Sequence, residues 1–258
     1  ARCLLTISTM YKRNSKLYIL AIVFWLSIWQ LVSSLMGQEI LLVSPVSALA
    51  RLGQLSLEVD FWKTVWYSFY KISLGFLLAF VLGIGMALLG SGSSTFRVLI
   101  QPLIATIQAI PVVSFIILCL IWVSSRNLSV LISFLMVLPI IYTNVLTGID
   151  SIDASFGDLA KVFKMKRSKI IRYIYLSEVY PHLKSATYVS LGLCWKSGIA
   201  AEVIGMPHMT IGENLYQAKI YLSTGDLFAW TLVIIVLSVA FRKVFVALMD
   251  RLVDRLSI

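Results

Sequence analysis

The chain has 258 residues, of which 59% are hydrophobic and 13% are charged, and its net charge is +10. Its mean hydropathy is +0.91. A soluble domain of this length needs many more charged groups on its surface, so the composition excludes a soluble protein and predicts an integral membrane protein. Nucleic-acid binding does not explain the positive charge, because the cations cluster at the ends of apolar segments, where they set membrane topology.

The fold class that we predict is an all-α membrane protein with six transmembrane helices. Residues 1–16 form a basic N-terminal segment, and one transmembrane domain covers residues 17–258. Met10 opens a run that is typical of a natural start, so we expect residues 1–9 to be disordered or foreign. Segments of roughly 20 apolar residues match the thickness of a bilayer. They cover about residues 17–32, 65–89, 98–123, 128–149, 183–206 and 227–249.

Two features of the first half predict helix packing. Residues 46–55 repeat apolar positions at helical spacing, which predicts a short helix at the membrane surface. In the second apolar segment, small residues recur every four positions, which gives one small helix face that another membrane helix can approach closely. These small residues are Gly75, Ala79, Gly83 and Ala87.

The third and fourth segments carry prolines and polar residues at membrane depth. Pro111 removes a backbone donor, so the third segment is not expected to be a plain lipid-facing rod. Gln108 lies just before it, and Asn144 lies in the second half of the fourth segment. We regard Gln108, Pro111 and Asn144 as candidates for lining a translocation pathway.

The cations give the orientation. With both termini in the cytoplasm, 16 of the 22 Lys and Arg residues lie inside and five outside, and Lys196 lies within a segment. This asymmetry predicts cytoplasmic termini. It also places the loop of residues 150–182 in the cytoplasm.

That loop holds six cations between residues 158 and 181. Leu159, Val162 and Phe163 fall on one apolar helix face, and Ile170, Ile171 and Ile174 form a second set after a basic turn. The periodicity alone leaves two interpretations open. The two short helices either dock onto a protein partner or lie on the inner leaflet with their lysines on lipid phosphates.

The same loop resembles the EAA loop of ABC-importer permeases. The residues that carry this resemblance are Asp158, Leu159, Ala160, Lys164, Ile174, Tyr175, Leu176 and Pro181. The resemblance extends from Leu42 onward, and it is to the nitrate, sulfonate and taurine branch. Its further matches are residues 42–47, Ile110-Pro111, Pro139-Ile140, Asn144, Gly148, Ala201-Glu202 and Ile211-Gly212.

The resemblance implies a type I permease fold in which the loop is a coupling helix seated in a groove of an ATPase subunit. The coupling residues would be Asp158, Leu159, Ala160, Lys161, Val162, Phe163 and Lys164, with Asp158 capping the helix start. Lys164 replaces the family's glycine, so the turn there either avoids positive φ or is strained. Ser177 replaces the family's proline, so we expect the loop to dock in a geometry that differs from the family's.

The resemblance also implies the partners and the site of energy input. We expect a second permease copy, two ATPase subunits, an extracytoplasmic solute-binding protein and the bacterial cytoplasmic membrane. No G-x-x-x-x-G-K-[ST] phosphate loop occurs in the chain, so ATP and Mg belong to the partner ATPase and no cofactor is bound here. The expected function is passage of a small anionic solute by alternating access. An ion-gradient-driven transporter or channel that works without an ATPase is the alternative.

Catalytic and metal sites are not predicted. The three cysteines and two histidines have neither disulfide nor metal spacing, and no catalytic set converges at one depth, which argues against a membrane enzyme. Two charges remain inside the fifth segment, Lys196 and Glu202, and intramembrane charges are functional candidates by default. They lie six residues apart, roughly 120° around a helix, and are not placed to pair with each other. Lys196 could meet an anionic solute, or it could have a structural partner such as Glu202 of the second copy.

Overall fold

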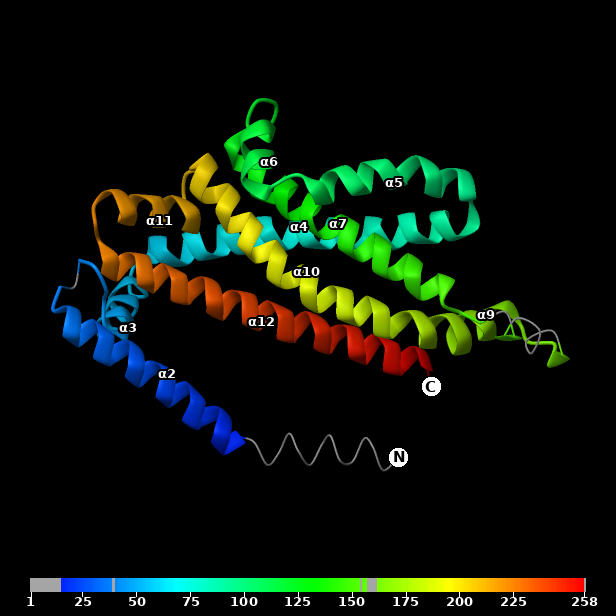
Figure 1. Cartoon of the computed structure of the whole chain (residues 1–258), viewed down its shortest axis with the longest axis horizontal. Helices are drawn as coiled ribbons and strands as arrows, with labels where there is room; N and C mark the ends of the chain where they lie inside the picture. The colour runs from blue at the N-terminus through cyan, green and yellow to red at the C-terminus, as the bar shows by residue number, and fades with distance from the viewer. Residues whose placement is uncertain (1–14, 39, 154, 157–161, 258) are drawn as a thin grey trace.

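The computed structural model describes residues 15–38, 40–153, 155–156 and 162–257, and the regular elements within them are all helices (Figure 1). The all-α prediction is therefore confirmed for this part of the chain. The helices are α2 (Ser15–Met36), α3 (Pro45–Leu55), α4 (Val59–Gly92), α5 (Ser94–Ala109), α6 (Val112–Cys119), α7 (Ser125–Asp150), α9 (Arg167–Ile170), the π-helix η1 (Ile171–Tyr175), α10 (Leu176–Gly205), α11 (Ile211–Ile220) and α12 (Thr224–Ser257).

Four long helices, α4, α7, α10 and α12, form the body of the molecule (Figure 1). Their residue pairs give their directions. Gly75 and Gly83 of α4 meet Ser133 and Ile141 of α7 in the same order, so these two helices are parallel. Helix α10 runs the other way, because its Gly198 lies at Ser133 while its His182 lies at Gly148. These directions agree with successive crossings of a membrane.

The small face of α4 is buried against α7, as the sequence predicts. A Cβ added to Gly75 would lie 2.4 Å from the Val130 carbonyl oxygen, and one added to Gly83 would lie 2.9 Å from Ile141 Cγ2. Ala79 and Ala87 are fully buried on the same face. Small side chains therefore bring the two backbones close together, which is how membrane helices gain packing energy where water supplies no hydrophobic drive.

Aromatic rings fill the space between α4, α10 and α12. The Phe76 ring lies 4.9 Å from Phe245 at an interplanar angle of 89°, an edge-to-face arrangement. Trp195 of α10 is 1% exposed and faces Phe69 and Phe241. This ring cluster fixes the registers of the three helices relative to one another.

The third predicted segment is broken into α5 and α6. The two helices meet at 105°, with Ile110 and Pro111 at the break. Pro111 has no N–H to continue the helix, and the residue before a proline is forced out of the α region, here to φ −78° and ψ 129° at Ile110. Residues 98–123 are therefore not a single straight helix.

Four described helices are long and apolar enough to cross a membrane, namely α2, α4, α7 and α12, and the bent pair α5–α6 makes a fifth if counted as one span. Helix α10 has 30 residues, long enough to cross, but it is not among them. Its interior carries Lys196 and Glu202. The count of six spans stays a prediction.

Two helices flank the membrane segments. The predicted surface helix is present as α3, and its first turn is capped by Ser44, whose hydroxyl accepts from the Ser47 amide at 3.1 Å. Helix α11 lies between the fifth and sixth predicted segments, where the sequence analysis predicted no helix. Its start has the residue pair of a capping box: Thr210 Oγ1 accepts from the Glu213 amide at 3.1 Å, and the Glu213 carboxylate accepts at 2.7 Å from the amide of Met209, the residue before the N-cap.

Candidate coupling loop and translocation pathway

The described residues of the predicted coupling loop that lie between α7 and α9 are at one end of the bundle (Figure 1). Asp158, Leu159, Ala160 and Lys161 lie outside the described residues. Among those described, helical conformation begins at Ser155, and Asp153 Oδ1 accepts from the Ser155 amide at 2.8 Å. These hydrogen bonds from Ser155 hold the pKa of the exposed Asp153 carboxyl below its usual value. Asp153 thus makes a capping contact where the sequence reasoning considered only Asp158.

Val162 and Phe163 are the described apolar residues of the predicted docking face. Their side chains are 78% and 70% exposed, so neither is buried against the described part of the chain. Exposed apolar side chains of this kind can be buried against another protein. Both predicted contact residues are thus available to a partner.

Lys164 has φ +46°, in the left-handed region. Of the two alternatives that the sequence left open, the turn keeps positive φ with a lysine instead of avoiding it. A Cβ-bearing residue pays about 1 kcal/mol for this conformation relative to glycine. The turn therefore has the backbone shape that glycine would favour, in spite of the substitution.

The second predicted short helix is the beginning of a much longer one. Helix α9, the π-turn η1 and α10 follow one another without interruption from Arg167 to Gly205. Ile174 is buried at this junction, whereas Ile171 is 61% exposed. The prediction of a separate element was wrong because the apolar spacing at 170–174 continues into that of α10. The loop is thereby connected directly to a core helix.

Polar contacts fix the helix ends on the loop side. Asp250 of α12 accepts from Lys184 Nζ at 2.6 Å and from the Tyr180 hydroxyl. Arg97 Nη2 of α5 lies 2.6 Å from Asp150 Oδ2, the last residue of α7. Both pairs are partly exposed, so each contributes modestly to stability, but together they bind four helix ends next to the loop.

The three candidates on α5 to α7 occupy different settings. Gln108 and Pro111 are exposed beside the bend between α5 and α6. Asn144 is half-buried and donates to the Ile140 carbonyl of its own helix at 2.8 Å. A separate cavity of about 200 Å³ lies nearer the loop, between α5 and α7. Its lining is Arg97, Gln101, Ile104, Tyr142, Thr143, Leu146 and Thr147.

Lys196 and Glu202 differ sharply although both lie on α10. Lys196 is exposed, and it has no hydrogen bond or ion pair with any residue of the described ranges. Glu202 is fully buried, and its Oε2 accepts from Ser68 Oγ at 2.8 Å and from the Gly212 amide at 3.2 Å. Glu202 Oε1 has no partner within the described structure.

The contacts of Glu202 join three helices. Ser68 of α4 also accepts from the Ile211 amide at 2.9 Å, so one hydroxyl links α4, α10 and the start of α11. A Cβ on Gly212 would lie 2.3 Å from Glu202 Cβ, which only glycine avoids. Sequence reasoning singled out Glu202 but missed Ser68, because nothing in the chain indicates contact across 134 residues.

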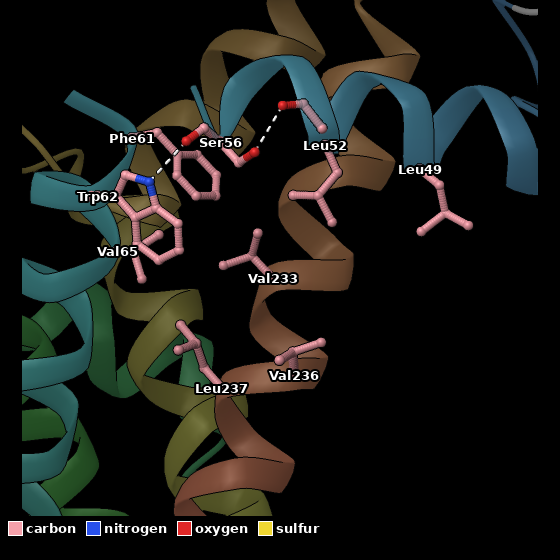
Figure 2. Close-up of a pocket in the computed structure, with 10 residues that line it drawn as sticks. Leu49, Leu52, Ser56, Phe61, Trp62, Val65, Val233, Val236 and Leu237 are labelled. Carbon is pink, nitrogen blue, oxygen red and sulfur yellow. Dashed lines mark hydrogen bonds between the residues drawn. The ribbon is translucent and has the colours of Figure 1, made fainter. Parts of the chain in front are cut away.

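An apolar groove on the body of the molecule does not suit a polar solute. It has a volume of about 430 Å³ and lies between α3, α4 and α12 (Figure 2). Its polar groups are already engaged: the Ser56 hydroxyl donates to the Gly53 carbonyl at 2.7 Å, and Trp62 Nε1 donates to the Ser56 carbonyl at 2.8 Å. The remaining lining is aliphatic or aromatic, which is typical of a hydrocarbon-facing surface.

Comparison with known proteins identifies the family of this chain. The family model described as "Binding-protein-dependent transport system inner membrane component" matches residues 79–258, which include the coupling loop and helix α10. The chain belongs to this family. It is therefore a multi-pass membrane permease subunit, and members of the family work with ATPase and binding-protein partners.

Relatives of this permease place it on one branch. It is 25% identical over 229 residues to the putative aliphatic sulfonates transport permease SsuC of Bacillus subtilis, covering 88% of this chain and 82% of that protein. It is 23% identical to the nitrate import permease NrtB of Synechococcus elongatus, covering 72% and 71%. Identity to the taurine transport permease TauC of Escherichia coli is 22%, with 70% and 66% covered. The resemblance to the nitrate, sulfonate and taurine branch is confirmed.

Proposed function

We infer that this permease is the membrane subunit of an ATP-driven importer in the bacterial cytoplasmic membrane. It passes a small anionic solute from an extracytoplasmic binding protein into the cytoplasm by alternating access. The observation that carries this proposal is the helical path that begins at Arg167, beside the exposed loop, and continues without a break to the exposed Lys196. Between these two residues it extends about 44 Å at 1.5 Å per residue.

The loop end of this path is the proposed docking site for the ATPase. Val162 and Phe163 present apolar surface, and the cations around them are exposed at Lys164, Lys166 and Lys169. Together with residues 158–161 they form the coupling segment. ATP and Mg are held by two ATPase subunits, and closure of those subunits moves the loop and the helix attached to it. The permease itself performs no chemistry.

The other end of the path is the proposed solute pathway. Lys196 carries a charge that a second subunit, water or a solute must stabilise at this depth, because lipid cannot. Glu202 does not serve as its counter-ion in a second copy, since Ser68 of α4 and the Gly212 amide of α11 already enclose that carboxyl. An anionic solute fits the free ammonium, and the solutes in the names of the relatives are anions or carry a sulfonate.

Gln108, Pro111 and Asn144 complete the proposed pathway with Lys196. A second copy of this chain supplies the matching half, so each solute passes between two α10 helices. Glu202 supports the pathway from behind by holding α11 onto α10 and α4. The ATPase states bias the two copies between outward and inward access through their different docking to the loops.

The test is a charge placed on the docking face. Phe163→Asp is expected to abolish co-purification of the ATPase and ATP-dependent uptake in reconstituted vesicles, because it puts a carboxylate where an apolar side chain is buried. Tyr221→Asp is the matched control, since Tyr221 is 77% exposed at the other end of the molecule. Unchanged co-purification with Phe163→Asp would remove the docking role. Uptake by the chain without ATP or an ATPase would instead favour an ion-gradient-driven transporter.

A further inference from the structure

A groove between α10 and α12 has a chemistry unlike that of the apolar groove in Figure 2. Its volume is about 480 Å³. One wall is Tyr188 of α10, and the rest belongs to successive turns of α12. The lining residues are Tyr188, Val239, Arg242, Lys243, Val246, Ala247 and Asp250.

The groove carries two cations that no described residue neutralises. Arg242 and Lys243 have no ion pair or hydrogen bond within the described ranges. The one acidic lining residue, Asp250, is already engaged by Lys184 Nζ at 2.6 Å and by the Tyr180 hydroxyl. The groove is thus a positively charged site, because Asp250, at one end of it, is already paired with Lys184 and Tyr180.

Apolar surface continues from the cations along α12. Val239 is 36% exposed one turn before Arg242, toward the middle of the membrane, and the buried Val246 lies one turn after it. The tyrosine ring of Tyr188 is 46% exposed on the opposite wall. A cationic patch with an adjoining aliphatic and aromatic wall matches an amphiphile, whereas a free inorganic anion would gain nothing from the wall.

The position of the groove fits the cytoplasmic leaflet. Arg242 and Lys243 lie in the cytoplasmic third of the last predicted segment, residues 227–249, on the side that the charge asymmetry assigns to the cytoplasm. Basic pockets between membrane helices on that side bind anionic headgroups, and arginine offers a planar pair of donors that matches a phosphate.

We propose that this groove binds an anionic phospholipid of the cytoplasmic leaflet. Arg242 and Lys243 hold the headgroup phosphate, and an acyl chain lies along Val239, one helical turn nearer the middle of the membrane. A lipid seated here contacts α10 between the coupling loop and Lys196, so it stabilises the helix that the proposed function uses for coupling. The lipid site itself does not depend on which solute is transported or on the identity of the ATPase.

The test compares lipid binding by the purified full protein and two matched double variants. Native mass spectrometry and titration with phosphatidylglycerol or phosphatidylcholine measure the preference for anionic lipid. Arg242→Gln with Lys243→Gln is expected to weaken phosphatidylglycerol binding about thirtyfold and to remove the preference. Arg126→Gln with Lys219→Gln removes the same charge from exposed residues at the other end and is expected to leave it unchanged.

Two further arms distinguish a lipid site from a folding defect and from a site for free anions. Arg242→Lys with Lys243→Arg keeps the charge and is expected to retain the preference, which guards against misfolding of the neutral variant. The proposal is overturned if the neutral variant keeps the preference for phosphatidylglycerol. It is also overturned if inorganic phosphate displaces the lipid at equal concentration, because the groove would then bind free anions.

Discussion

Helix α2 is exposed along nearly all of its surface in the isolated subunit, whereas α10 is exposed along part of its surface, and the two exposed surfaces differ in chemistry. The span of α2 from Ile19 to Met36 is only 6% buried and carries no charged residue. Along α10, five exposed or half-buried positions at helical spacing form one stripe. They are Ser185, Val189, Gly192, Lys196 and Ala200.

This difference indicates what covers each surface. Large apolar side chains all around α2, such as Trp25 at 67% exposure, are what a helix surrounded by hydrocarbon requires. The stripe on α10 consists mainly of small residues and includes a lysine, and contact with lipid would make that lysine energetically costly. Exposure in the isolated subunit therefore has two meanings: lipid contact for α2, and a pathway or second copy for α10.

The largest expected effect comes from placing the same charge on α2 and on α10. Val23 of α2 and Val189 of α10 are the same residue type at 56% and 61% exposure. Val23→Lys is expected to cost about 3 kcal/mol and to reduce the membrane-integrated protein about a hundredfold. Val189→Lys is expected to stay within about threefold of wild type, because the stripe is not lipid-facing.

The matching valine-to-leucine changes at positions 23 and 189 control for side-chain size. Quantitative blotting of carbonate-resistant membrane protein measures integration for all four variants. If Val189→Lys lost as much integrated protein as Val23→Lys, the stripe on α10 would face lipid, and the contrast with α2 would fail.

Helix α4 allows a smaller test, because its buried and exposed faces each carry a glycine. Gly83→Leu is expected to destabilise the protein by about 2 kcal/mol, since its added Cβ alone would lie 2.9 Å from Ile141 Cγ2. Gly85→Leu should be nearly neutral, because nothing lies within 4 Å of an added Cβ there. Thermal unfolding of the solubilised protein measures both, and equal midpoints would contradict the close packing of α4 on α7.

The packing of α4 could be predicted from sequence because the signal was local. Small residues that recur every four positions lie on one helix face. Any other membrane helix can pack against such a face, so its identity was not needed for the prediction. The break at Pro111 was indicated in the same way, since proline limits its own helix and the residue before it. Its 105° angle was not predictable, because tertiary contacts of α6 set the direction.

The missed features depend on contacts between distant residues or on a signal that was overlooked. The hydrogen bond from Ser68 to Glu202 joins residues 134 apart, and no periodicity indicates it. Helix α11, by contrast, had a local signal in the capping box of Thr210 and Glu213. For the coupling loop, the sequence identified exposed apolar residues at Val162 and Phe163, but it could not choose the backbone conformation at Lys164.

The last and smallest expected effect concerns the charge at the centre of the α10 stripe. Lys196→Met keeps the length of the side chain and removes its charge, so uptake of an anionic solute is expected to fall about tenfold, the cost of one charge-assisted contact. Assembly should not change, because the Lys196 side chain has no hydrogen bond or ion pair in the described structure. Lys196→Arg retains the charge and should keep most uptake, while Lys219→Met removes an exposed charge from α11 and should have no effect. If Lys196→Met assembled normally and kept wild-type uptake, Lys196 would not contact the solute. The second copy would then be what keeps this face of α10 away from lipid.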